Sequence, residues 1–214
     1  MLNDKFTYYD SLPRDYLDQV LVYEGGYTED KSDAGNIIRD KSGKIIGYSA
    51  TCRGITAGAL AAAKKQGLVA QTVTVKSLLN DLESVRKIYS KNYYLKGKCD
   101  QLPHPLAFAH FDMCVNSGIG GRNSKGTAIG AGANLQKVLI ACGANIVLDG
   151  SIGPKSIAAL DNILATKSAK DIAKMYNDQR EQYYYAIVKA RPANQKFLKG
   201  WLRRLNSVRA FCNK

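Results

Sequence analysis

Apolar positions near the start of the chain recur at the spacing of an α-helix. Leu17, Val20 and Leu21 fall on one face of such a helix, which we predict to run from about residue 12 to residue 24. Ser11 is a suitable N-cap for this helix, and Pro13 suits its first turn. The apolar stripe is expected to pack against the rest of the chain.

Glu24 falls at the next position of the same apolar stripe. Burying a charged carboxylate is costly, so this position favours the protonated acid. A carboxyl group that keeps its proton near neutral pH can act as a general acid. We expect Gly25 and Gly26 to stop the helix in a left-handed cap and to leave bare backbone where a bulky substrate can approach. An ordinary helix end followed by a glycine cap is the simpler alternative.

The pattern changes after Tyr27. Residues 28–36 are mainly polar and predict a loop, whereas residues 37–39 and 44–48 are short apolar stretches on either side of a turn at 40–43. This arrangement predicts a small β-hairpin. It is the only pair of strands that the sequence leads us to expect.

The rest of the chain is predicted to be helical. Thr56 is expected to cap a helix that ends at Gly67, and Thr74 a helix that reaches about Tyr89. Residues 103–116 are apolar almost all round, which predicts a helix buried at the centre of a bundle. The glycine-rich residues 118–132 are expected to form a long flexible connection. The other predicted helices cover residues 133–141, 154–164, 169–189 and 194–212.

Length and composition set the class of protein. A chain of 214 residues with 45% hydrophobic and 23% charged residues can bury a real core, as one domain or one domain with a small appendage. No apolar run reaches the ~18 residues of a transmembrane helix. The N-terminus lacks the basic segment and apolar core of a signal peptide, so we expect synthesis in a cytoplasm without one.

The cysteines and histidines give no sign of a cross-link or a metal. The five cysteines are an odd number, are widely spaced and include no Cys-x-x-Cys pair. Cys114 and Cys142 lie in apolar helical patterns, where buried thiols are common. His104 and His110, the two histidines, do not sit at a metal-ligand helical spacing. We predict no disulfide framework, no metal site and no cofactor.

Charge is spread unevenly along the chain. The net charge is +13, yet the first fifty residues hold six basic and nine acidic side chains, and from Lys189 onward there are eight basic residues and no acidic one. Such a field favours a polyanion such as nucleic acid, an acidic envelope polymer or a membrane surface, although a solvated face is the simpler alternative. No nucleic-acid motif is present, and the acidic region around Glu24 would repel phosphate, so we expect no nucleic-acid partner.

The basic tail itself is expected to form a packed helix. Its apolar residues recur at helical spacing and should face the domain: Phe197, Leu198, Trp201, Leu202, Leu205 and Val208. Four basic residues should then be more exposed: Lys196, Lys199, Arg203 and Arg209.

Seven short motifs follow one another along the chain. They are Glu24-Gly25-Gly26-Tyr27, Asp33-x-Gly35, Thr51-x-x-Gly54-Ile55-Thr56, Phe111-Asp112-x-x-Val115-Asn116-Ser117-Gly118, Leu135-Gln136, Asp149-Gly150-Ser151-Ile152-Gly153-Pro154 and Phe197-Leu198-Lys199-Gly200-Trp201-Leu202-x-Arg204. Over residues 12–206 the chain resembles glycoside hydrolase family 108, the phage and bacterial muramidases built on a Glu-Gly-Gly-Tyr motif. Each motif is weak alone, but seven in order are specific. The chain departs from the family where Asp-Pro-Gly-Gly is usual, because an inserted hairpin separates Asp33-Ala34-Gly35 from Thr51.

The resemblance implies a mainly α, lysozyme-like α+β fold. This is a helical bundle around a buried central helix with one small β-hairpin lobe. Residues 1–95 would form an N-terminal catalytic part, and residues 96–214 a helical part that resembles a peptidoglycan-binding module, the two packed as one lysozyme-like unit. The signature of that module lies within residues 149–160.

The resemblance also implies cleavage of the β-1,4 bond between N-acetylmuramic acid and N-acetylglucosamine, with Glu24 as the catalytic acid. Such cleavage needs a proton on the leaving oxygen and a second group that manages the oxocarbenium-like charge. Asp33, in a polar loop, would stay ionised and suits the second role, with Asp30 the next choice and Glu29 the third. A turn-forming role is the alternative for Asp33. By analogy with phage-type lysozymes, Thr51 would position the water.

Further residues are predicted to bind substrate. Tyr27 belongs to the motif around the acid, and Asn116 and Ser117 end the buried helix, where they bind sugar amides or simply cap that helix. The tyrosines at 183–185 could stack on sugars, but at helical spacing at least one ring should lie in the core. Family position suggests that Arg180 braces the active-site helix through a charge-assisted bond.

The leading interpretation is a monomeric phage endolysin or related muramidase. It would act on periplasmic peptidoglycan after release, with its basic C-terminal helix facing an anionic envelope surface. Two alternatives stay open: a lytic transglycosylase that uses Glu24 and no water, and a non-catalytic cell-wall-binding protein.

Overall fold

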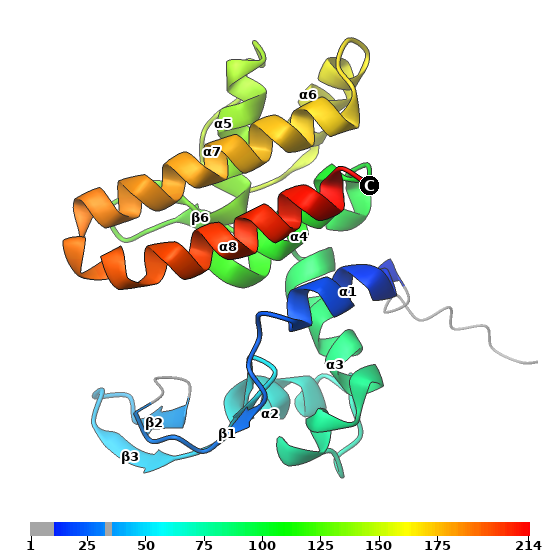
Figure 1. The fold of residues 1–214 in the computed structure, drawn as a ribbon. Helices are drawn as coiled ribbons and strands as arrows, with labels where there is room; N and C mark the ends of the chain where they lie inside the picture. The colour runs from blue at the N-terminus through cyan, green and yellow to red at the C-terminus, as the bar shows by residue number, and fades with distance from the viewer. Residues whose placement is uncertain (1–10, 33–35) are drawn as a thin grey trace, which may run out of the picture. The chain divides into compact units, whose positions relative to one another are not determined.

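The computed structural model describes residues 11–32 and 36–214 of the chain (Figure 1). The chain divides into two compact units, residues 1–91 and residues 92–214. Most of the described chain is helical and its strands form small antiparallel sheets, so the predicted mainly α, lysozyme-like α+β class is confirmed. None of the described helices is long and apolar enough to cross a bilayer.

The first helix, α1 (Arg14–Leu21), buries the apolar face that its spacing predicted. The buried residues are Tyr16, Leu17 and Val20. The helix is shorter than predicted, because it begins directly after Pro13, which occupies the N-cap position in place of Ser11. It also ends three residues before Glu24, so this carboxyl group lies beyond the helix and not in its last turn.

The chain leaves α1 without a left-handed glycine. The N–H group of Tyr23 donates to the carbonyl group of Val20 at 3.0 Å, which tightens the last turn. Gly25 and Gly26 are not among the described residues with positive φ. The predicted left-handed glycine cap is therefore wrong, because the helix has already ended before the glycines are reached.

A three-stranded antiparallel sheet follows that the sequence did not reveal. Its order is β1 (Tyr27–Thr28), β4 (Thr51–Cys52) and β5 (Ile55–Thr56). Each strand has only two residues, too few for alternation to be recognised in a sequence. Arg53 and Gly54 join β4 to β5 with φ values of 49° and 71°, as a tight type I′ hairpin turn requires.

The predicted β-hairpin is confirmed. Strand β2 (Ile37–Arg39) pairs antiparallel with β3 (Ile45–Tyr48). Asp40 holds the turn, because its Oδ1 atom accepts hydrogen bonds from the N–H groups of Ser42 at 2.9 Å and Lys44 at 3.1 Å. Such aspartate turns satisfy backbone donors that the hairpin leaves unpaired.

Capping residues determine where the helices of unit 1 begin. Thr56 caps α2 (Ala57–Lys65) as predicted, because its hydroxyl group accepts from the N–H group of Ala59 at 3.2 Å. The single helix predicted between Thr74 and Tyr89 is instead two helices, since Asp81 interrupts the first and caps the second. These are the 3₁₀ helix η3 (Lys76–Leu79) and α3 (Leu82–Tyr89). The π-helical turn η4 (Ser90–Leu95) and the 3₁₀ helix η5 (Cys99–Gln101) come next.

Unit 2 is built around α4 (Leu106–Ser117), as its apolar sequence predicted. Residues 106–114 are all buried. Helix α4 packs against α5 (Gly130–Ala141), α7 (Ala169–Ala190) and α8 (Gln195–Cys212). Figure 1 shows α7 and α8 running side by side, with α4 behind them. Helix α6 (Pro154–Leu164) packs on α5, and the 3₁₀ helix η6 (Pro192–Asn194) joins α7 to α8.

Residues 118–132 are not the flexible connection that the sequence predicted. They form a hairpin, β6 (Gly121–Arg122) with β7 (Ala128–Ile129), and the start of α5. The N–H group of Gly121 donates to the carbonyl group of Gly150 at 2.9 Å, which fixes the hairpin to the 149–150 turn. Gln136 of α5 holds the same turn, because its Oε1 atom accepts from the N–H groups of Asp149 at 3.0 Å and Gly150 at 2.7 Å.

The contact between Gly132 and Gly150 predicts a large stability effect. A Cβ atom at Gly132 would lie 2.1 Å from the carbonyl oxygen of Gly150, and this backbone cannot move aside cheaply. We expect Gly132→Ala to lower the free energy of unfolding by about 3 kcal/mol or more. Urea unfolding followed by circular dichroism measures it.

Gly153→Ala is the matched control. Its new Cβ atom meets nothing within 4 Å and its φ of −119° suits any residue, so we expect a change within ~0.5 kcal/mol. Equal effects of the two substitutions would contradict the close contact.

Candidate active site

The carboxyl group of Glu24 lies against the turn between β4 and β5. A Cβ atom at Gly54 would come 2.8 Å from Oε2 of Glu24 and 3.0 Å from the hydroxyl group of Tyr89. Tyr89, which is buried at the end of α3, donates that hydroxyl hydrogen to the carbonyl group of Arg53 at 2.7 Å. Only a glycine at position 54 leaves room for the carboxyl group here, and Tyr89 fixes the turn that carries this glycine.

The backbone beside Glu24 is open. Gly25 and Gly26 are exposed, and a Cβ atom at either would meet no other atom within 4 Å. Glu24 itself is half-buried. The acid therefore combines a tightly packed contact at Gly54 with bare backbone next to it, as the sequence predicted for a substrate approach.

Thr51, predicted to position a water, serves to hold a loop. Its hydroxyl group donates to Oδ1 of Asn36 at 2.8 Å. Asn36 is fully buried, and its Nδ2 group donates to the carbonyl groups of Thr28 at 3.3 Å and Asp30 at 2.9 Å. Asn36 was not predicted as a site residue, because a lone asparagine in a polar loop gives no sequence signal of its partners.

The second carboxylate stays a prediction. Asp33 lies outside the described residues. Asp30 is exposed, and its Oδ1 atom accepts hydrogen bonds from the N–H group and the hydroxyl group of Ser32, both at 2.8 Å. These bonds, the backbone bond first, lower the pKa of Asp30, so it stays ionised while it closes a turn.

Tyr27 and Glu29 are brought together. Tyr27 lies in β1 and donates its hydroxyl hydrogen to Oε1 of Glu29. This bond raises the pKa of Tyr27, and burial and the charge of Glu29 act in the same direction. Glu29, the third choice for the second carboxylate, is therefore already hydrogen-bonded to Tyr27, which is predicted to bind substrate.

In unit 2, Asn116 is held by side chains from α7. Its Oδ1 atom accepts hydrogen bonds from the hydroxyl group of Tyr184 at 2.7 Å and from Nη2 of Arg180 at 3.4 Å. Ser117 donates to the same oxygen at 3.1 Å. Both Asn116 and Ser117 are half-buried at the end of α4. With its carbonyl oxygen engaged, Asn116 keeps its amide N–H groups for a further partner.

A buried ion cluster lies beneath these residues. Asp112 of α4 pairs with Arg180 at 2.7 Å and with Arg204 of α8 at 2.9 Å, and all three side chains are almost completely buried. Burial by itself would lower the pKa of Arg180, but the charge of Asp112, its hydrogen bond and the nearby Tyr184 and Tyr176 together outweigh burial and raise the pKa. Arg180 thus braces α4 through a charge-assisted bond, as its position suggested.

The tyrosine run divides between core and surface. Tyr184 is buried, Tyr183 half-buried and Tyr185 exposed. The Tyr184 ring stacks on Trp201 of α8, with centroids 5.3 Å apart, and Trp201 stacks on Phe197 at 5.9 Å. The expectation that at least one tyrosine ring lies in the core is met by Tyr184.

One cluster that the sequence did not predict could hold a metal. Cys99, His110 and Cys114 lie together in the interior of unit 2, the sole group of potential metal-binding side chains in the part of the chain that the structure describes. Burial raises the pKa of the Cys99 thiol; at Cys114 burial acts likewise, but a hydrogen bond from Cys99 and the charges of His110 and Arg180 outweigh it and lower the pKa to about 5. The overlooked signal was the spacing His110-x-x-x-Cys114, four residues on one helix face.

Two family models and a solved structure match this chain. The family model Glycosyl hydrolase 108 matches residues 17–118, and the model described as Predicted Peptidoglycan domain matches residues 131–206. A solved structure entitled "Structure of Brucella abortus SagA" is 28% identical, covers 92% of this chain and 91% of its own, and superimposes with a TM-score of 0.59. A comparison with curated proteins finds no match.

Fold, site and matched models together define a glycoside hydrolase that acts on peptidoglycan. Residues 17–118 match glycoside hydrolase family 108, and the matched peptidoglycan domain follows them along the chain.

The ion cluster predicts a strong dependence on Asp112. We expect Asp112→Asn to lower the free energy of unfolding by about 3–5 kcal/mol, because two guanidinium groups would stay buried without a counter-charge. Chemical denaturation of the two proteins measures the difference.

Asp178→Asn is the control for this prediction. Asp178 pairs with Lys174 and Arg209 at the surface, so its loss should cost less than about 1 kcal/mol. If the two substitutions destabilised the chain equally, Asp112 would not be the buried anchor described above.

Proposed function

We propose that this hydrolase is a muramidase that cleaves the β-1,4 bond between N-acetylmuramic acid and N-acetylglucosamine, with Glu24 as its general acid. The observation that carries the proposal is the placement of the Glu24 carboxyl group, fitted against Gly54 and flanked by exposed backbone at Gly25 and Gly26. The sugar approaches over this bare backbone. The match to family 108 and the Glu-Gly-Gly-Tyr motif support the assignment.

In this mechanism Glu24 gives its proton to the glycosidic oxygen as the bond to the anomeric carbon breaks. A second, ionised carboxylate stabilises the oxocarbenium-like charge or activates a water. Asp33 is proposed for that role in preference to Asp30, because Asp30 already closes a turn with Ser32. Thr51 acts on the reaction through Asn36, which fastens the loop that follows β1.

The amide of Asn116 and the Tyr27 ring are proposed to bind the glycan. Asn116 is oriented for this by Tyr184, which occupies its oxygen atom and leaves the N–H donors. Such donors suit the carbonyl oxygens of N-acetyl groups.

Glu24→Gln provides the direct test. Glutamine keeps the size of the side chain but cannot donate a carboxylic proton, so we expect an unchanged fold and a loss of wall-lytic activity of ~10²-fold or more. Clearance of permeabilised bacterial cells and release of soluble fragments from purified peptidoglycan measure it. Near-wild-type clearance would remove Glu24 from the mechanism.

The same assay separates the remaining alternatives. Asp33→Asn should be damaging but less complete than Glu24→Gln, and inactivation by Asp30→Asn alone would reverse the choice of second carboxylate. Mass spectrometry of the digest distinguishes reducing muramic acid ends, expected for a hydrolase, from the anhydro ends that a lytic transglycosylase forms. A non-catalytic wall-binding protein would release neither.

We further propose that the chain is a monomeric endolysin of phage type that reaches periplasmic peptidoglycan after release from the cytoplasm. Attachment to anionic envelope polymers or lipids would come from α8. Lys196, Lys199 and Arg203 are exposed on this helix. Arg209 differs from the expectation: it is half-buried and bonds Asp178 at 2.8 Å and Glu181 at 2.7 Å, so its charge is already neutralised.

Charge reversal on α8 tests this attachment. We expect Lys196, Lys199 and Arg203 all changed to Glu to weaken binding to isolated envelopes and flatten its salt dependence, because screened surface charge supplies the attraction. Cleavage of a short soluble glycan should hardly change. Binding is measured by co-sedimentation across a salt series.

The control carries the same change of net charge elsewhere on unit 2. Lys137, Lys155 and Lys167 are exposed outside α8 and are likewise changed to Glu. If both triple variants bind as weakly as each other, net charge and not the α8 surface drives attachment. If neither differs from the parent protein, the basic residues are only a solvated face.

A further inference from the structure

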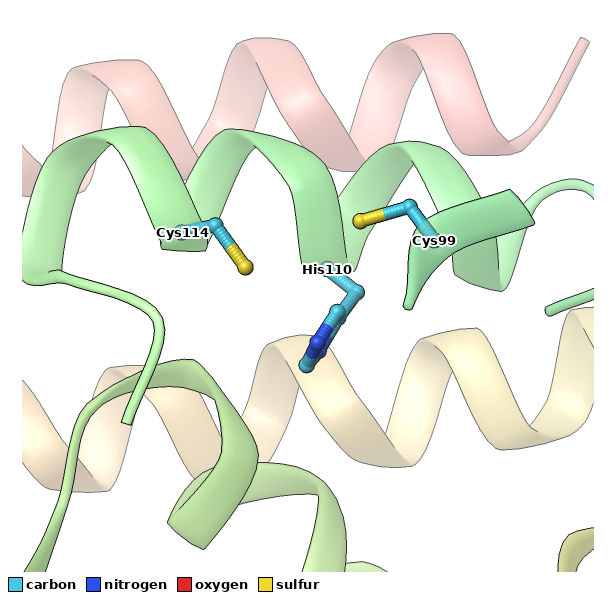
Figure 2. A group of neighbouring side chains, drawn as sticks. All are labelled: Cys99, His110 and Cys114. Atoms are coloured by element: carbon cyan, nitrogen blue, oxygen red, sulfur yellow. The ribbon is translucent and has the colours of Figure 1, made fainter. Parts of the chain in front are cut away.

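Two thiols and an imidazole converge in the core of unit 2. The Sγ atoms of Cys99 and Cys114 and a ring nitrogen of His110 all lie within 4.8 Å of one another. None of the three residues is exposed to solvent. Figure 2 shows Cys114 and His110 projecting from α4, with Cys99 reaching toward them from the short helix beside it. We propose that Cys99, His110 and Cys114 bind a zinc ion.

The backbone brings these donors together from two elements. His110 and Cys114 are four residues apart and therefore share one face of α4. Cys99 arrives on η5, after a tight turn in which Lys98 has a φ of 62°. A Cβ atom at Gly97 would lie 2.7 Å from the sulfur of Cys114 and 3.4 Å from that of Cys99, so glycine is what lets this turn approach both sulfurs.

The spacing of the donors is close to that of a zinc site. Zn–S bonds of ~2.3 Å and Zn–N bonds of ~2.0 Å in a tetrahedron place donor atoms roughly 3.5–3.8 Å apart. Donors that already lie within 4.8 Å of one another need to move together by only about 1 Å to meet this geometry. Thiolate and imidazole are also the ligands that zinc prefers over the harder cations.

His110 already has the outer contacts of a metal-binding histidine. Its Nε2 atom lies 3.1 Å from the carbonyl oxygen of Gly97, and its Nδ1 atom lies 3.1 Å from the hydroxyl group of Tyr176. With Nδ1 bound to the ion, the Nε2–H group keeps the Gly97 carbonyl oxygen as the acceptor that fixes the ring and its tautomer. The Tyr176 hydroxyl group can donate its hydrogen to the carbonyl group of Ala131 at 3.4 Å, which leaves a lone pair of its oxygen for the ion.

The site is closed and therefore structural. Zinc in such sites takes four ligands, and the Tyr176 hydroxyl group beside His110 can supply the fourth. Zn²⁺ bound by two thiolates is neutral overall, so no net charge has to be buried. The ion would tie η5 to α4, the helix that ends at Asn116 and Ser117.

Metal analysis of the full chain tests the proposal. The protein is produced with added zinc and purified under reducing conditions without a chelator. We expect one zinc ion per chain by elemental mass spectrometry, and, after exchange with Co²⁺, a thiolate-to-cobalt charge-transfer absorption. Competition with a chromophoric chelator should show that Cys99→Ser and Cys114→Ser each bind zinc at least ~100-fold more weakly, since a lost ligand costs more than a lost outer contact.

Matched controls isolate the site. Cys142→Ser should bind zinc as the parent protein does, because Cys142 lies near Met175 and outside the cluster. Tyr176→Phe removes the fourth ligand and should weaken binding ~10–100-fold, less than either cysteine variant, because a neutral hydroxyl group is a weaker zinc ligand than a thiolate. The cobalt spectrum of the parent protein remains a readout should a cysteine variant fail to fold.

Three results would overturn the proposal. One is a reduced, folded parent protein that takes up no stoichiometric zinc, which would make the cluster ordinary core packing. Another is a disulfide between Cys99 and Cys114, detected by non-reducing peptide mapping of protein that was purified without a reductant and without a zinc chelator. The third is zinc binding that is as tight in Cys99→Ser and Cys114→Ser as in the parent protein. None of these readouts depends on muramidase activity.

Discussion

The arrangement of unit 2 depends on one buried carboxylate. Asp112 sits in the middle of α4, where every neighbouring residue is apolar or buried, and meets guanidinium groups from α7 and α8. A single aspartate there would be prohibitively costly, and so would either arginine. Together the three side chains fix how α4, α7 and α8 are rotated about their axes, because each helix must direct its charged residue to the same place. The same ion cluster also orients the polar end of α4. Arg180 donates a hydrogen bond to Asn116, a residue predicted to bind sugar.

Close backbone contacts have the same role where α5 meets the 149–150 turn. Gly132 and Gly120 admit the carbonyl group of Gly150, and Gln136 satisfies the backbone donors of that turn. These positions include motif residues that carry the family resemblance, yet none of them presents a reactive group. The motif residues Gln136, Asp149 and Gly150 therefore hold a turn against a helix. The proposed catalytic acid is instead Glu24. There too a glycine makes close packing possible, because Gly54 has no side chain and leaves room for the Glu24 carboxyl group.

How far the sequence predicted the structure depended on the range of the interactions involved. Helices α6, α7 and α8 were predicted to within one or two residues at each end, because helical periodicity and capping residues are local. The two-residue strands of the β1–β4–β5 sheet were missed, since their pairing is set by distant residues and by the turn at Arg53. The glycines at 118–132 were taken for flexibility, although close packing against Gly150 explains them.

The candidate site shows the same limit. Glu24 was singled out because an acid at an apolar position is unusual in itself, and its catalytic role stays a prediction. Asn36 and Tyr89 could not be singled out, because each owes its role to partners that are distant in the chain. In the Cys99 cluster only the His110–Cys114 spacing was visible locally, and Cys99 joins it through the fold.

Charge counted along the chain likewise overstates the charge that a partner can meet. From Lys189 onward Arg204 is neutralised by Asp112, and Arg209 by Asp178 and Glu181. The exposed cations that remain around the α7–α8 connection lie at Lys189, Arg191, Lys196, Lys199 and Arg203.

Lys189 near the C-terminus of α7 is favourably placed for the helix dipole, so helix stability alone explains it. For Lys196 the helix dipole acts in the opposite direction. It lies in the first turn of α8, where the dipole disfavours a cation and where no acidic residue is present to offset it. The ammonium group of Lys196 instead lies 5.0 Å from the centre of the Phe197 ring, a cation–π contact whose gain of about 0.5–1 kcal/mol is as large as the dipole cost. Local contacts therefore account for Lys196 as well as for Lys189, and the exposed charge of this surface rests chiefly on Arg191, Lys199 and Arg203.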